Sequence, residues 1–150
     1  MLRVYRRIFP AVLLAPILAV LMAPAAWSAT VDGLSDQQVK ALDARVRERW
    51  QALSARDYTK AWEYSTPAYR RVFPKDMYTL QFSYAVERQL TDVEVLNYDA
   101  PAAVASVTVR VMSKPVKLTS EASTSLGALP VTINEKWVFV DGNWWHSASD

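Results

Sequence analysis

The side chains that could do chemistry are few in this sequence of 150 residues, and its single histidine, His146, is the most distinctive of them. A histidine in a cavity can act as a general acid or base, or it can contact a ligand. Its place close to the end of the chain also fits a histidine at the surface or on the rim of a pocket. Because the chain has no cysteine, a thiolate nucleophile is excluded, and a metal centre lacks its usual ligands.

Three aspartates are the candidate carboxylate bases. Asp57 precedes a helical pattern and fits an N-cap, and Asp99 precedes Ala-Pro and fits a turn. Asp92 would be a base if it pointed inward, but Val93 and Val95 occupy the inward face of that strand. The sequence also shows no Ser-His-Asp order, phosphate-binding glycine loop or metal motif. It therefore predicts no catalytic residue, no metal and no cofactor, and enzyme activity stays an open alternative.

Aromatic side chains are the other informative group, because five tryptophans follow residue 28. We expect some of these aromatic side chains to pack in the core. The others can line a pocket for an apolar or aromatic small molecule. Adjacent strand residues such as Trp144 and Trp145 must face opposite sides, so one fits the core and the other an interface. The candidate ligand-binding residues are Trp50, Trp62, Tyr84, Trp137, Trp145 and His146.

The first 28 residues have the order of a secretory signal peptide. Arg3, Arg6 and Arg7 precede an uncharged stretch that runs from Ile8 to Ala29 and ends in small residues. Three prolines interrupt this stretch, which favours cleavage after Ser28 over a retained membrane anchor, the alternative. We therefore predict a Sec-type signal peptide at 1–28, one domain at 29–150, and a periplasmic or secreted protein.

Charge argues against nucleic-acid binding. The chain has 17 basic and 15 acidic residues, but three of the arginines belong to the leader, which leaves 14 basic residues against 15. On the first helix, Arg45, Arg49 and Arg56 share one face. We interpret this face as solvated, and docking of an acidic partner or anionic lipid is the alternative.

The periodicity of the chain positions these residues. Ser35 and Gln38 predict a capping box for a first helix whose apolar stripe recurs at helical spacing. The stripe consists of Val39, Leu42, Val46, Trp50 and Leu53. A shorter helix follows Asp57, a connector holds residues 69–71, and Pro74 begins a third helix. On this third helix, one predicted apolar face holds Phe73, Met77, Leu80 and Tyr84, and the other holds Tyr78, Phe82 and Ala85.

After the helices the apolar period changes to two, which predicts antiparallel strands. We expect strands at 92–96, 105–111 and 131–140, a mobile loop or an edge strand around 116–119, and a final strand beginning at Asn143. Asp141-Gly142 fits a two-residue hairpin turn. The order predicts an α+β fold in which N-terminal helices pack on a curved antiparallel sheet, a cone-like or cystatin-like roll.

This pattern resembles the nuclear transport factor 2-like superfamily, which includes SnoaL-like proteins and ketosteroid isomerases. The first match is a long first helix with a late tryptophan, Trp50, that ends in Ala55-Arg56-Asp57-Tyr58. The second is the segment around Trp62, Ala-Trp-Glu-Tyr-Ser-Thr-Pro-Ala-Tyr. The third is a final hairpin with Asp-Gly and an aromatic return strand, Glu135 to Trp145. Together they cover about residues 35–148.

The resemblance implies a cone with an enclosed pocket, and many members pair through the open sheet face. Its isomerases use a buried carboxylate base and a tyrosine, but the first helix stripe here has no tyrosine. We therefore expect an exported bacterial member without a recognisable active site that binds a small apolar ligand or a protein partner as a homodimer. The alternatives are an isomerase- or dehydratase-like enzyme using a cavity carboxylate or His146, and an accessory subunit of an envelope complex.

Overall fold

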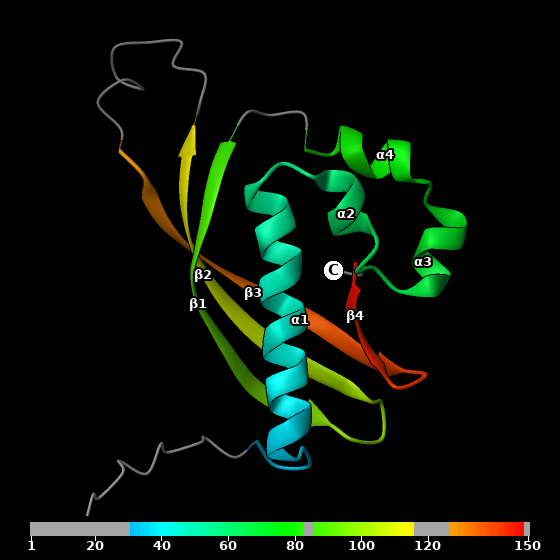
Figure 1. Ribbon diagram of the computed structural model, residues 1–150. Coiled ribbons are helices and arrows are strands. Elements are labelled where there is room, and N and C mark those ends of the chain that lie inside the picture. The colour runs from blue at the N-terminus through cyan, green and yellow to red at the C-terminus, as the bar shows by residue number, and fades with distance from the viewer. Residues whose placement is uncertain (1–30, 83–85, 116–126, 149–150) are drawn as a thin grey trace, which may run out of the picture.

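A computed structural model describes residues 31–82, 86–115 and 127–148, in which helices cover one face of an antiparallel sheet (Figure 1). The helices are α1 (Asp36–Ser54), α2 (Tyr58–Trp62), α3 (Pro67–Val72) and α4 (Lys75–Leu80). The strands are β1 (Val86–Asp99), β2 (Val104–Pro115), β3 (Leu129–Val140) and β4 (Asn143–Ser147), paired in the order β1-β2-β3-β4. The helices lie on the inner side of a curved sheet, which confirms the predicted α+β class.

The long helix α1 begins and packs as its sequence predicts. The side chain of Ser35 accepts a hydrogen bond from the backbone of Gln38, and the Gln38 side chain accepts one in return from the backbone N–H of Ser35. The predicted stripe is buried from Leu42 to Leu53, whereas Val39 at its start is only partly covered. Helix α1 is therefore held both by its cap and by its contact with the sheet.

The segment after α2 differs from the prediction. Asp57 caps α2 by accepting from the backbone N–H of Lys60, as expected. Residues 69–71, however, are not a connector but part of helix α3. The Thr66 side chain accepts a hydrogen bond from the backbone of Tyr69, and Pro67 occupies the first turn, where its missing N–H costs nothing.

Of the two apolar faces predicted for α4, the face with Met77 and Leu80 is wrong and the inward position of Tyr78 on the other face is confirmed. Met77 and Leu80 are 52% and 71% exposed, whereas Tyr78 is buried against the rings of Tyr69 and Phe82. With only six residues, α4 presents a single face to the rest of the domain, and Tyr78 occupies it. Tyr84 and Ala85, expected on the two faces of this helix, lie outside the described residues.

The first strand is longer than the alternation around Val93 predicted. β1 begins at Val86, and its pairing with β2 shifts register between Leu90 and Asp92 and again between Val95 and Asn97. Each shift interrupts the period-two pattern of the strand. The alternation in the sequence therefore predicted only the stretch of β1 between the two shifts. The final hairpin follows the prediction, because Asp141 and Gly142 have φ angles of 51° and 77°.

The core lies between α1 and the inner face of the sheet. Alternate residues of β2 from Ala105 to Val111 point inward, as do Trp137 on β3 and Trp144 on β4. Trp144 is buried and its neighbour Trp145 is partly exposed on the other side of the strand, as predicted. The inner face is therefore crowded with large side chains, and any polar group among them needs a partner.

Some predictions concern residues outside the described ranges: the signal peptide at 1–28, the domain start at 29 and the edge strand at 116–119. They stay predictions. Among the helices that the structure describes, none combines the length and hydropathy needed to cross a membrane.

Candidate functional site

A buried ion pair lies between α1 and the sheet. Arg49 on α1 donates from Nη1 to Glu135 Oε1 on β3 at 2.7 Å, and the two side chains are only 7% and 4% exposed. Two indoles add to this carboxylate: Trp50 Nε1 donates to Oε1 and Trp137 Nε1 to Oε2, each at 3.0 Å. One carboxylate thus holds three donors from two elements of the fold.

Periodicity explains how these side chains meet. On β3 the inward residues alternate, so Glu135 stands on the same face as Trp137 and Ile133. On α1, Arg49 precedes the stripe residue Trp50 and turns toward the sheet. The predicted solvated face is therefore wrong for Arg49, because its charge finds a counter-ion in the core. Arg56 does lie at the surface, where it pairs with Glu87.

His146 lies beside the Glu135 carboxylate and its three donors. It pairs with Trp137 across β3 and β4, and the two rings meet edge to face at 5.7 Å. Its Nε2 lies 3.9 Å from Glu135 Oε1, and its side chain is 14% exposed, so it is more deeply buried than a surface histidine. Burial, reinforced by the charge of Arg49, lowers the pKa of His146 to about 2. The imidazole is therefore neutral at physiological pH.

Arg49, Trp50, Glu135 and His146 line a cavity of about 390 Å³, called here the core cavity, and Trp137 lies behind Glu135 outside its lining. Its apolar lining includes Trp50, Leu53, Phe82 and Ile133, and its polar lining includes Arg49, Arg88, Glu135 and His146. Within the described part of the chain, three buried nitrogen atoms of these lining residues have no hydrogen-bond partner. They are Arg49 Nε, Arg88 Nη1 and His146 Nδ1.

The arrangement is better suited to binding than to proton transfer. A histidine with a pKa near 2 is a weak base at neutral pH. Both oxygens of Glu135 are engaged by donors of the protein itself, from Arg49, Trp50 and Trp137. In the described ranges no group of three or more potential ligands is placed to hold a metal ion.

The aspartates considered as bases lie away from this cavity. Asp57 caps α2, and Asp99 accepts a hydrogen bond from the backbone of Ala102 in the β1–β2 turn, as predicted. Asp92 forms an ion pair with Arg110 on the outer side of the sheet, which Glu94 also joins. Asp57 and Asp99 thus have the cap and turn roles that the sequence favoured, and Asp92 lies on the strand face opposite Val93 and Val95.

The six candidate ligand-binding residues separate into two groups. Trp50, Trp137 and His146 surround Glu135 at the core cavity. Trp62 and Trp145 lie instead on the other side of β4, where both contact Arg70. Tyr84 is outside the described residues. The aromatic set is therefore not one binding surface.

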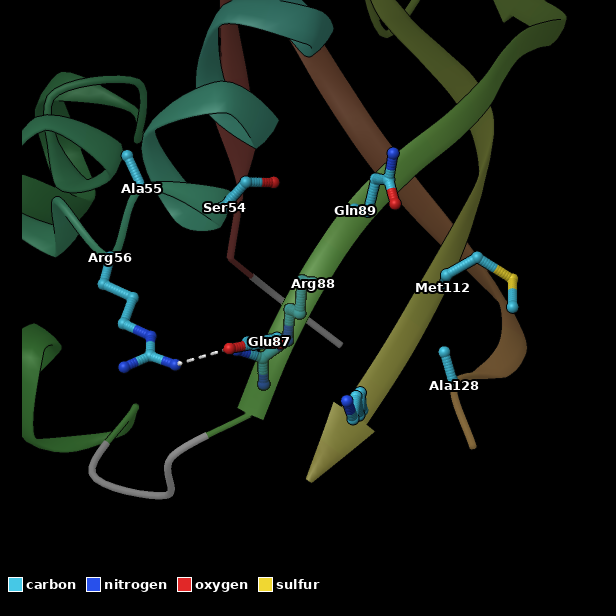
Figure 2. Close-up of a pocket in the computed structure, with 9 residues that line it drawn as sticks. Ser54, Ala55, Arg56, Glu87, Arg88, Gln89, Met112 and Ala128 are labelled. Atoms are coloured by element: carbon cyan, nitrogen blue, oxygen red, sulfur yellow. Dashed lines mark ion pairs between the residues drawn. The ribbon is translucent and has the colours of Figure 1, made fainter. Parts of the chain in front are cut away.

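A second hollow lies at the end of α1 (Figure 2). Figure 2 shows Arg56 extending toward Glu87, with Met112 and Ala128 on the far side. The Arg56–Glu87 separation is 3.8 Å, and both side chains are well exposed. Its volume is about 580 Å³, but its lining is dominated by exposed polar side chains, so we place the candidate site in the core cavity.

Comparison with known proteins addresses the fold. No protein-family model matches the sequence, and no curated protein matches it. Among solved structures, a candidate dehydratase of the NTF2-like family from Streptomyces avermitilis matches over 76% of this chain and 95% of its own, with a TM-score of 0.53 and 17% identity. This similarity concerns the fold alone: helices packed on a curved antiparallel sheet, as in that NTF2-like structure.

Two other solved structures are more weakly similar. A SEC-C motif containing protein from Rhodopseudomonas palustris has a TM-score of 0.49 and 14% identity, over 73% of this chain and 77% of its own. Aln2 from a Streptomyces species has a TM-score of 0.47 and 11% identity, over 76% and 89%. At such identities the chemistry of this chain follows from its own residues.

The sequence reasoning missed Glu135 and Arg88 as cavity residues and took Arg49 for a surface cation. One signal was present: between Ile133 and Trp137, Glu135 is the charged residue at an inward position of an alternating strand. A charge at that position calls for a buried partner. Which partner it finds depends on how α1 crosses the sheet, which the sequence does not show.

The low pKa of His146 predicts a pH-dependent stability. In the unfolded chain the imidazole has its ordinary pKa of 6.5, whereas in the folded protein the pKa is about 2. Between these values the unfolded state binds a proton that the folded state does not. We expect His146 to make the free energy of unfolding fall by about 1.4 kcal/mol for each pH unit below 6.5.

This expectation is checked by urea unfolding at several pH values between neutral and mildly acidic. The variant His146→Gln lacks the titrating group, so its stability should fall less steeply with acidification than that of the wild type. Parallel slopes in the two proteins would show that His146 is protonated equally in both states.

Proposed function

We propose that this protein is an exported nuclear transport factor 2-like protein that binds a small molecule in the cavity between α1, β3 and β4 without transforming it. The observation that carries the proposal is one cavity lined both by apolar rings and by buried polar atoms without partners in the described chain. A volume of about 390 Å³ lies within the range of small-molecule sites.

The lining supports a ligand that is largely apolar but carries a hydrogen-bond acceptor. Trp50, Leu53, Phe82 and Ile133 offer apolar contact. A buried donor without a partner costs about 1–3 kcal/mol, so a ligand acceptor that meets Arg49 Nε or Arg88 Nη1 removes such a cost on binding. This adds a polar group to the apolar ligand that the sequence favoured.

The alternative functions have weaker support. An isomerase- or dehydratase-like reaction needs a base, and the environments of His146 and Glu135 disfavour that role. A partner on the sheet would favour an apolar outer surface, whereas Arg110, Asp92 and Glu94 place an ion cluster there. Among the described residues, exposed large apolar side chains are scattered over strands and helices. They are Leu96 on β1, Leu129, Val131 and Val140 on β3, and Val72, Met77 and Leu80 on the helices.

Native mass spectrometry of the protein, purified gently from its own envelope, tests the proposal. We expect an added small mass on the wild type and its loss in Ile133→Trp, because the larger ring fills the cavity. Thr132→Trp is the matched control, since Thr132 is exposed on the other face of the same strand. An empty protein, or one that carries another protein in place of a small molecule, would contradict the proposal.

A further inference from the structure

A ladder of alternating aromatic rings and cations lies beside the edge strand β4, on the side to which Trp145 points. The guanidinium carbon of Arg70 is 5.5 Å from the centre of the Trp62 ring and 5.1 Å from that of Trp145. The guanidinium carbon of Arg45 is 5.2 Å from the Trp145 ring and 4.6 Å from the Tyr64 ring. Residues from α1, α2, α3 and β4 thus form one continuous stack.

The rings of this ladder are fixed by hydrogen bonds of their own. Trp62 Nε1 donates to the Phe73 carbonyl at 3.0 Å, and Trp145 Nε1 donates to the Val140 carbonyl at 3.2 Å. Stacking engages the flat faces of a guanidinium group, whereas its N–H donors project from the edge. The ladder therefore holds Arg70 in place and leaves its donors for another partner.

The charges of the ladder are unevenly compensated. Lys60 pairs with Glu63 at 2.7 Å, and Arg45 lies 3.7 Å from Glu48 and donates to the Trp144 carbonyl. Arg70 has no ion pair with a described residue, and its Nε is buried without a hydrogen-bond partner among them. A buried guanidinium N–H without an acceptor is costly, so the position of Arg70 favours an added acceptor.

These residues surround a hollow of about 330 Å³. Its lining consists of Arg45, Lys60, Trp62, Glu63, Tyr64, Arg70 and Trp145. Two carboxylates oppose these three cations, Glu63 in the lining and Glu48 beside Arg45, so the hollow keeps an excess of one positive charge, that of Arg70. Because Trp145 and His146 are adjacent on β4 and face opposite sides, this hollow is separate from the core cavity and does not depend on its function.

We propose that this hollow is an oxyanion site, in which the edge of Arg70 binds a phosphate group. Charge-assisted hydrogen bonds from a guanidinium fork to an oxyanion are stronger than neutral ones, and the planar fork matches phosphate geometry. The phosphate belongs either to a small metabolite or to a lipid headgroup, since the same chemistry recognises both.

The first test is an NMR titration of the folded protein with inorganic phosphate, compared with chloride at equal ionic strength to remove general screening. We expect saturable shifts of the indole N–H signals of Trp62 and Trp145. Arg70→Gln should weaken binding roughly tenfold or more. Arg71→Gln is the matched control, because Arg71 is the exposed neighbour on α3 and contributes nothing to the ladder.

Arg70→Lys separates a binding site from a structural stack. The lysine keeps the positive charge and loses the planar fork, so we expect phosphate binding weaker than in the wild type and stronger than in Arg70→Gln. The proposal is overturned if phosphate causes no saturable shift beyond that of chloride. It is also overturned if Arg70→Gln and Arg71→Gln bind phosphate equally well.

Sedimentation with lipid vesicles distinguishes the two sources. Binding to phosphatidylglycerol vesicles that is lost in Arg70→Gln, with none to phosphatidylcholine vesicles, assigns the site to an anionic lipid headgroup. Saturable binding of free phosphate without vesicle binding assigns it to a soluble phosphorylated molecule. If Arg70→Gln only lowers the melting temperature and wild-type protein binds neither probe, the ladder is a structural element and the proposal is wrong.

Discussion

Glu135→Gln should lower the free energy of unfolding by about 3–5 kcal/mol, because it leaves a buried guanidinium without its counter-ion. Arg49 is 7% exposed and its charge is opposed directly by Glu135. The substitution also turns one carboxylate oxygen into an N–H donor. Since Oε1 accepts from Arg49 and Trp50 and Oε2 accepts from Trp137, at least one of these donors must lose its acceptor. A loss of this size is a large part of the stability of an ordinary domain.

Urea unfolding followed by tryptophan fluorescence measures this loss, and Glu94→Gln is the matched control. Glu94 also pairs with an arginine, Arg110, but both side chains are about half exposed, so that variant should change stability by less than about 1 kcal/mol. Equal effects of the two substitutions would mean that the core pair is solvated in the folded protein.

A double-mutant cycle separates the ion pair from its surroundings. Arg49→Met removes the buried charge that Glu135→Gln leaves uncompensated, so the two substitutions together should cost less than the sum of their separate costs. The double variant should still be less stable than the wild type. The glutamine amide has a single acceptor oxygen, whereas the Trp50 and Trp137 indoles donate to two different oxygens in the wild type. Additive losses would show that Arg49 and Glu135 do not act as a pair.

Trp137→Ala should cost about 3–5 kcal/mol, because it opens a cavity at a fully buried position. It also removes the N–H that Glu135 Oε2 accepts, and it removes the edge contact with His146.

Trp145→Ala provides the comparison for the same amino acid on the opposite side of the hairpin. Trp145 is partly exposed and stacks on Arg45 and Arg70, so its loss should cost about 1–2 kcal/mol. Thermal and urea unfolding of both variants measure the two losses of stability. If the two alanine variants were equally stable, the core would not be centred on Trp137 as the structure has it.

Local chemistry explains which elements were predictable. The capping box at Ser35, the cap at Asp57 and the turn at Asp141-Gly142 each depend on residues a few positions apart, so the sequence alone specifies them. The short helix α3 was not predicted although Thr66 and Pro67 carry its start signal, because a proline is also a common signal for the end of a helix. The bulges in β1 hid most of that strand, since each changes the phase of the alternation.

The residues of the candidate site could be predicted only in part. Trp50, Trp137 and His146 were predicted to contact a ligand, and all three lie around Glu135. Trp62 and Trp145 belong to a separate stack on Arg70. The predicted ligand contacts stay predictions. What the sequence did not predict is the ion pair that joins the first three residues.

The sequence by itself determined the α+β order, the alternating faces of the strands and the caps of the first helices, because these follow from interactions within a few residues. Only the tertiary structure decided that Arg49 meets Glu135 and that Arg70 stacks between Trp62 and Trp145. The residues of each group are far apart in the chain. Their contacts depend on the angle at which α1 crosses the sheet and on the course of the helices beside β4 (Figure 1). Those are set by packing of the whole domain.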